Sequence, residues 1–150
     1  MAMPRDAPID PRFAEIVALF ERLAPADVAR LGDHYASDVR FKDPFNEVVG
    51  LAEVQRIFGH MFSALDGPRF VVHEVVSQGD RGFLTWDFRF RFKRGDRAEQ
   101  NVRGASHIVL DAAGRIALHR DYWDAAEELY EKLPLLGALM RWVRRRVNAG

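Results

Sequence analysis

The feature that most constrains the fold of this chain is a strict alternation of side chains over residues 83–93. Apolar side chains occupy one face of the predicted strand: Leu84, Trp86, Phe88, Phe90 and Phe92. Polar side chains occupy the other face: Thr85, Asp87, Arg89 and Arg91. A period of two is typical of a strand that buries only one face. The sequence therefore predicts a sheet whose aromatic face is covered by other elements.

Three further strands are predicted around this one, over residues 70–78, 97–110 and 115–124. Short turn sequences rich in Gly and Asp separate all four segments. Strands that follow one another through tight turns pair with their neighbours and form an antiparallel meander.

Helical spacing dominates the first part of the chain. Apolar residues recur every three or four positions over residues 11–23, 25–35 and 51–65. A short strand is predicted between the second and third helices, and Pro44 ends it directly after Asp43. Helices followed by a run of strands indicate an α+β domain. We expect a curved antiparallel sheet wrapped around the N-terminal helices, which would leave a conical pocket suited to a small molecule.

The composition excludes several classes of protein. The 150 residues fit one domain, and 22 basic and 22 acidic residues give no net charge, so we expect no nucleic-acid partner. The chain has no cysteine and no pair of histidines at helical i, i+4 spacing, so we expect no metal site. It shows no signal-peptide pattern and no run of ~20 apolar residues, so a cytoplasmic location is expected.

The predicted organisation is a flexible N-terminus over residues 1–10, the domain over residues 11–133, and a basic helix or tail over residues 134–150. The last segment contains Arg141, Arg144, Arg145 and Arg146. This segment could be a solvated helix end, a contact with a partner subunit, or a contact with an anionic membrane surface. We favour the solvated helix end, because cations are stabilised near the C-terminus of a helix by its dipole.

Two segments resemble the nuclear transport factor 2-like superfamily, which has the cystatin-like fold. One runs from Val39 to Pro44 and is followed by Gly50 and a helix; the other is residues 114–124, which contain Arg120, Asp121 and Tyr122. The closest likeness is to the SnoaL-like and ketosteroid-isomerase-like branch. This resemblance implies a small apolar ligand, no cofactor, and often a homodimer, here through the polar outer face of the sheet.

Only some of the catalytic residues of these related enzymes have counterparts in this sequence. Asp43 matches the general base of ketosteroid isomerases, but the first helix has no tyrosine and Ser106 stands where those enzymes have a protonated aspartate. Asp121 matches an aspartate of limonene epoxide hydrolases and a pocket aspartate of SnoaL-like cyclases. The other two epoxide hydrolase groups would fall near Phe88 and Phe90, which are apolar.

Each candidate carboxylate has two interpretations. Asp43 is either a general base in the pocket or a turn residue that caps backbone amides near Pro44. Strand parity places His119, Asp121 and Trp123 on one face. Asp121 is then either an acid or base paired with His119, or a structural carboxylate.

The function predicted first is a cofactor-independent isomerase or polyketide-cyclase-like enzyme in which Asp43 or Asp121, with His119, moves a proton on an apolar carbonyl or polycyclic substrate. The residues predicted to bind that substrate are Tyr35, Phe45, Phe58, Trp86, Phe88, Ser106 and Trp123. Ser106, His119 or Tyr35 would polarise a substrate oxygen. The aromatic rings are also suited to core packing, which is the more common role of such residues. The alternative is a non-catalytic module that binds a hydrophobic ligand or dimerises.

Overall fold

The computed structural model describes residues 8–128, 142 and 145–147 and confirms the α+β class. Three helical segments and two strands precede a run of four strands and a short last helix. In order they are α1 (Pro11–Arg22), the 3₁₀ helix η1 (Pro25–Asp33), β1 (Tyr35–Lys42), β2 (Glu47–Val49), α2 (Leu51–Ala64), β3 (Leu65–Gln78), β4 (Arg81–Phe92), β5 (Gln100–Leu110), β6 (Ile116–Tyr122) and α3 (Ala125–Glu128).

A single six-stranded sheet has the order β2-β1-β6-β5-β4-β3. The predicted meander is present, because β3, β4, β5 and β6 pair in sequence and antiparallel. β1 joins β6 in parallel, so the sheet is mixed, and β2 closes the edge as a short hairpin partner of β1. The parallel pairing of β1 with β6 brings the start of the chain beside its last strand.

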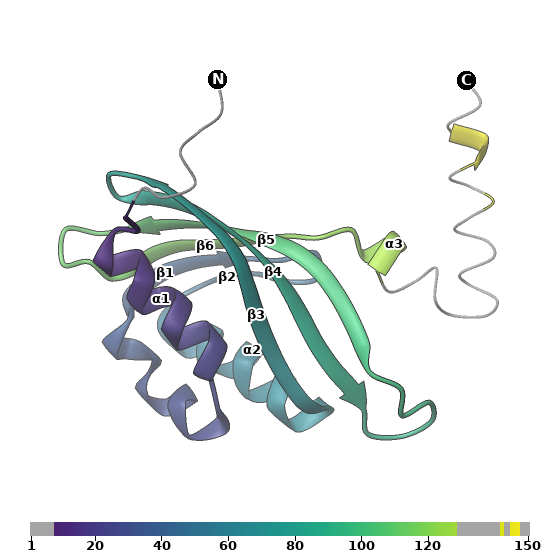
Figure 1. Ribbon diagram of the computed structural model, residues 1–150. Helices are drawn as coiled ribbons and strands as arrows, with labels where there is room; N and C mark the ends of the chain where they lie inside the picture. Colours follow the sequence, from purple (N-terminus) through teal and green to yellow (C-terminus); the bar gives the residue numbers. More distant parts are fainter. Residues whose placement is uncertain (1–7, 129–141, 143–144, 148–150) are drawn as a thin grey trace.

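The helices cover one face of this sheet, and the long strands β3 to β5 bend over them (Figure 1). Asp10 caps α1 by accepting a hydrogen bond from the Arg12 amide. The apolar stripe of α1 and the inward face of α2 enter one core with the inward residues of β1 and β4. The aromatic face of β4 is therefore the covered face, as its alternation predicted.

Several element boundaries differ from the prediction, and two of these differences have a clear physical reason. The second helix is a 3₁₀ helix that ends at Asp33, and Tyr35 begins β1 instead, because its backbone pairs with Ile116 in the parallel ladder. β3 begins at Leu65 and runs through Gly67 and Pro68, where a turn was expected. A register shift at this point, together with the edge position of β3, accommodates the proline without losing the sheet.

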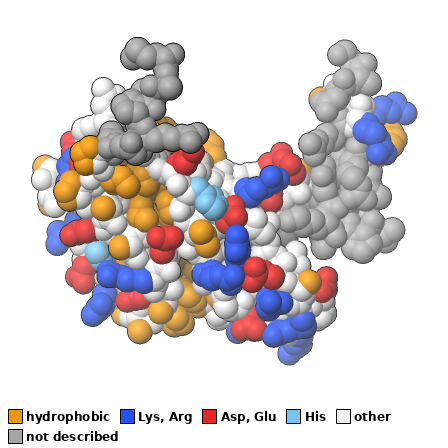
Figure 2. All heavy atoms as spheres, in the orientation of Figure 1, with side chains coloured by type: hydrophobic (Ala, Val, Ile, Leu, Met, Phe, Trp, Pro, Cys, Tyr) orange, Lys and Arg blue, Asp and Glu red, His pale blue; other side chains and the backbone are white. Residues whose placement is uncertain are grey.

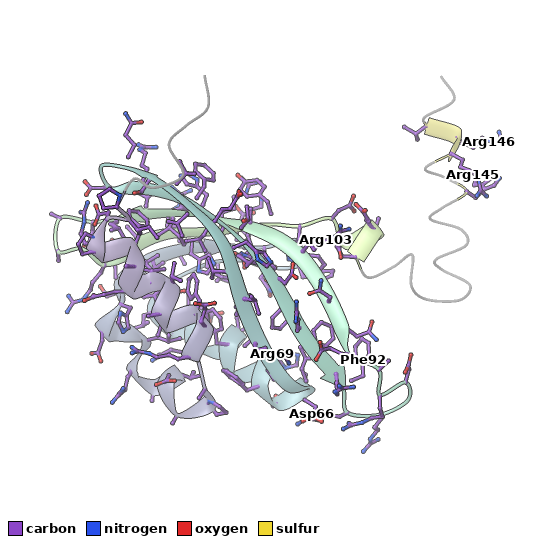
Figure 3. The ribbon with its side chains drawn as sticks, viewed as in Figure 1. Asp66, Arg69, Phe92, Arg103, Arg145 and Arg146 are labelled. Atoms are coloured by element: carbon purple, nitrogen blue, oxygen red, sulfur yellow. The ribbon has the colours of Figure 1, made fainter. Side chains whose placement is uncertain are left out.

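The described surface carries interspersed charges of both signs (Figure 2). α3 is tied to β5 by Arg103, which forms ion pairs with Glu127 and Glu128 (Figure 3). Most of the predicted basic segment, residues 134–150, lies outside the described residues. Within the part of the chain that the structure describes, no helix is both long enough and apolar enough to span a membrane.

Candidate functional site

A cavity of about 320 Å³ lies between α2 and the inward face of the sheet. This volume falls within the range of small-molecule sites. Its wall is mainly aromatic: Phe41, Phe58, Phe70, Trp86, Phe88 and Phe90. Among the described residues that line it, only Asp43, His60 and Asp121 have ionisable side chains. A ligand would therefore meet a largely apolar surface with very few polar contacts.

The long wall of the cavity is the alternating face of β4. Trp86 and Phe92 are six residues apart and both line the cavity, so this wall extends for ~20 Å along the strand. Phe92 lies at the far end of β4, near the first residues of β3 (Figure 3). The same parity places Asp87 and Arg89 on the outer face, where Asp87 pairs with both Arg89 and His73.

A glycine on β5 sets the position of Trp86. Gly104 is the cross-strand partner of Trp86, and the indole ring occupies the space that a Cβ on Gly104 would need. Because the ring lies over β5, its Nε1 reaches the next inward residue of that strand, Ser106, at 2.9 Å. Trp86 is thus both a wall of the cavity and the first donor of a buried polar network.

That network continues to Asp121. The Ser106 hydroxyl donates to Asp121 Oδ1 at 2.5 Å, and His119 Nε2 lies 2.8 Å from the same oxygen. On the other side of the imidazole, the Tyr35 hydroxyl lies 2.8 Å from Nδ1. Four strands, β1, β4, β5 and β6, therefore supply one continuous chain of hydrogen bonds.

The direction of each bond in this chain follows from its donors. An indole N–H can only donate, so Ser106 accepts from Trp86 and gives its own hydrogen to the carboxylate. Burial and the nearby charge of Asp121 raise the pKa of Tyr35 well above its ordinary value, so its hydroxyl keeps its hydrogen. Tyr35 can then donate to Nδ1, and in the tautomer that accepts this bond Nε2 carries the hydrogen that is donated to Asp121.

The two oxygens of Asp121 are thus unequal. Oδ1 accepts from His119 and Ser106, while no hydrogen bond to Oδ2 occurs among the described residues. The side chain is 15% exposed and lines the cavity. One oxygen is held by the protein, and the other is available to a bound molecule.

Asp43 also lines the cavity but is held differently. Its Oδ1 accepts from the backbone amides of Phe45 and Asn46 at 2.8 and 2.6 Å, and both oxygens accept from the Asn46 side chain at 3.1 Å. This is the turn-capping arrangement, the second of the two interpretations that the sequence left open.

Of the residues predicted to bind a substrate, five line the cavity: Phe45, Phe58, Trp86, Phe88 and Trp123. Tyr35, Ser106 and His119 do not line it; all three are buried behind Asp121. They therefore support the carboxylate rather than meet a substrate oxygen directly. Ser106 and His119 border a second, very small cavity next to Asp121.

Several lining residues were not singled out from the sequence. Phe41 and Phe92 were recognisable only as inward positions of strands, and His60 and Met61 as part of a helix. Strand parity and helical spacing predicted that these side chains point inward, but not that a cavity lies next to them. No group of three or more His, Asp or Glu side chains in the described residues is arranged to hold a metal ion.

A family model for the SnoaL-like domain matches residues 16–119. The chain belongs to the SnoaL-like family. It lies within the nuclear transport factor 2-like superfamily, as the two sequence segments had indicated. The comparison with curated proteins gave no match.

Solved structures of this fold resemble the SnoaL-like protein over most of its length. A proposed SnoaL-like polyketide cyclase from Jannaschia sp. CCS1 is 15% identical, with a TM-score of 0.69, over 83% of this chain and 94% of that one. TerC, co-crystallised with polyporic acid, is 18% identical with a TM-score of 0.67, over 79% and 95%. An epoxide hydrolase from M. tuberculosis, resembling limonene epoxide hydrolase, is 14% identical with a TM-score of 0.63, over 79% of each chain. At these identities the likeness shows the fold alone.

Proposed function

We propose that this SnoaL-like protein is a cofactor-independent enzyme in which Asp121 transfers a proton on an apolar, ring-containing substrate with a carbonyl or hydroxyl group. Isomerisation and cyclisation next to a carbonyl are the reaction classes that such a group serves. The proposal assigns proton transfer to Asp121, its support to His119 and Ser106, and substrate contact to the aromatic wall.

One observation carries the proposal: a carboxylate that lines an apolar cavity has one oxygen held by two donors, and the other oxygen receives no hydrogen bond among the described residues. A general base must lie within hydrogen-bond reach of the proton that it takes. The two bonds to Oδ1 hold the carboxylate in one orientation, so the position of Oδ2 is fixed as well. Such preorganisation is what proton transfer requires from the protein.

The aromatic wall supports a ring-containing ligand. Phe70 packs edge-on against Trp86 and stacks on Phe88, so these rings already form a continuous apolar surface. Ring contacts of this kind suit flat, apolar molecules. The co-crystallisation of TerC with polyporic acid and the proposed cyclase role of the Jannaschia protein agree with this ligand class within the same fold.

A probe reaction tests the proposal without knowledge of the natural substrate. In the elimination of 5-nitrobenzisoxazole, a base removes the proton on C3, the N–O bond breaks, and a coloured cyanophenolate is released. We expect the protein to exceed acetate at equal carboxylate concentration, and Asp121→Asn to lose about 10²–10⁴-fold in rate, the usual contribution of a general base. The asparagine oxygen can still accept from His119 and Ser106, so the fold is preserved.

The alternative is a protein of the same fold that binds a hydrophobic ligand without catalysis. It predicts a rate no greater than that of acetate, while a neutral apolar dye still binds in the cavity. That pair of results would contradict the enzymatic proposal and leave the binding function.

A further inference from the structure

We infer that Asp43 is a positioning residue that fixes an aromatic gate, formed by Phe45 and Trp123, at the cavity. In this assignment the carboxylate of Asp43 takes no part in proton transfer. The inference rests on one part of the proposed function, namely that the cavity binds a ligand.

The turn that carries Phe45 is built around Asp43. The β1–β2 hairpin has Lys42 and Glu47 as its last pair, and the Asp43 amide donates to the Asn46 carbonyl at 2.9 Å. The side chain of Asp43 then accepts the amides of Phe45 and Asn46, which face the inside of the turn. Aspartate commonly closes turns in this way, and asparagine has the same side-chain acceptor.

Phe45 reaches from this turn to a residue that follows β6, the strand paired with β1. Its ring packs edge-on against Trp123, which follows β6, with 5.4 Å between the ring centroids. Both residues line the cavity, yet 55% of Phe45 is exposed. A large apolar side chain that is half in solvent and also lines a cavity stands at the boundary between the two. The contact joins two segments that are otherwise separate in sequence.

The hydrogen bonds of Asp43 argue against a role as base. Both of its oxygens accept from Asn46, and Oδ1 also accepts from two backbone amides. The carboxylate therefore stabilises the turn. Removing it should change the rates at which a ligand enters and leaves the cavity.

The test measures association and dissociation of the neutral dye N-phenyl-1-naphthylamine by stopped-flow fluorescence. Removing the aromatic contact with Phe45→Ala should raise both rates roughly twofold to tenfold, since an aromatic pair contributes on that order. Asp43→Ala should raise both rates in the same way. Asp43→Asn should keep the rates of the unmodified protein, because its side-chain oxygen still accepts the two amides.

The outcomes separate the gate from the function of the cavity. If the dye binds but Asp43→Ala leaves both rates unchanged, or Asp43→Asn raises them as much as Asp43→Ala does, the inference is wrong. An increase in dissociation alone would make Phe45 an ordinary contact and also contradict a gate. If the dye does not bind at all, the proposed function and the gate fail together.

Hydrogen exchange at the Phe45 and Asn46 amides decides the positioning role independently of any ligand. Protection in the unmodified protein and in Asp43→Asn, with loss in Asp43→Ala, would support it. Equal protection in all three proteins would refute it. Far-ultraviolet circular dichroism confirms that each variant is folded.

Discussion

Two aspartates border the same cavity, and the protein holds them in opposite ways. Asp43 receives its hydrogen bonds from residues two and three positions further along the chain. Asp121 receives its bonds from side chains of β5 and β6, and that support extends to Tyr35, 84 residues before His119. The first carboxylate stabilises a local turn. The second is held by tertiary structure and keeps one oxygen for the cavity.

The comparison shows why a carboxylate in a pocket is not enough to assign chemistry. Both side chains line the cavity, and Asp43 has the closer resemblance to a known catalytic base. What distinguishes them is the number and origin of the donors. A carboxylate whose oxygens are all engaged serves structure, while one with a free, oriented oxygen can exchange a proton with a bound molecule.

The largest expected change in stability comes from breaking the support of Asp121. His119→Leu leaves the buried Tyr35 hydroxyl without its partner and removes one donor from the carboxylate. Each of these two losses costs ~1–3 kcal/mol, so the free energy of unfolding should fall by about 2–6 kcal/mol. Urea denaturation measures this change.

Asn46→Ala is the matched change at the other aspartate. It removes the side-chain donor but keeps both backbone amides on Asp43, so the free energy of unfolding should fall by no more than about 1 kcal/mol. Equal losses for the two variants would contradict the distinction between a tertiary network and a local turn.

A smaller effect is expected from displacing Trp86. Gly104→Ala places a methyl group where the indole ring lies, so the ring must move away from Ser106. Overpacking of this kind costs ~1–3 kcal/mol, and the affinity for the apolar dye should fall with it. Gly59→Ala is the control: its Cβ meets nothing within 4 Å inside α2, so the variant should be as stable as the unmodified protein or more so.

The smallest effect concerns the outer face of the sheet, away from both aspartates. Burial acts to raise the pKa of Asp87, but hydrogen bonds from His73 and Arg89 outweigh it and leave the pKa below its ordinary value. Asp87 therefore stabilises the fold above pH ~3.9, and this contribution is lost as the pH falls through the lowered folded-state pKa. Thermal unfolding of Asp87→Asn should show a weaker loss of Tm on acidification. An unchanged pH profile would contradict this role.

Much of the fold was predictable because the relevant patterns are local. The alternation over residues 83–93 and the turns beside it predicted β4, its covered face and the meander. The parity of β6 likewise placed His119 and Asp121 together. Such patterns indicate on which face of a strand each side chain lies. That information is enough to predict a sheet with one covered face.

The rest of the site depends on contacts between distant segments. The parallel pairing of β1 with β6 brings Tyr35 to His119, although helical spacing had assigned Tyr35 to the end of a helix. Trp86 reaches Ser106 only because its partner on β5 is a glycine. The sequence left the role of Asp43 open because an Asp-Pro pair is compatible with both a general base and a turn. The hydrogen-bond donors around the carboxylate distinguish these two roles, and they are visible only in the structure.

The most direct test of the account compares Asp121→Asn with Asp43→Asn in the elimination of 5-nitrobenzisoxazole. Both substitutions remove one negative charge from the same cavity and keep an acceptor oxygen, so they differ only in which carboxylate is lost. We expect the Asp121 variant to lose about 10²–10⁴-fold in rate and the Asp43 variant to stay within about threefold of the unmodified protein. The reverse order, with Asp43→Asn inactive and Asp121→Asn active, would contradict the account.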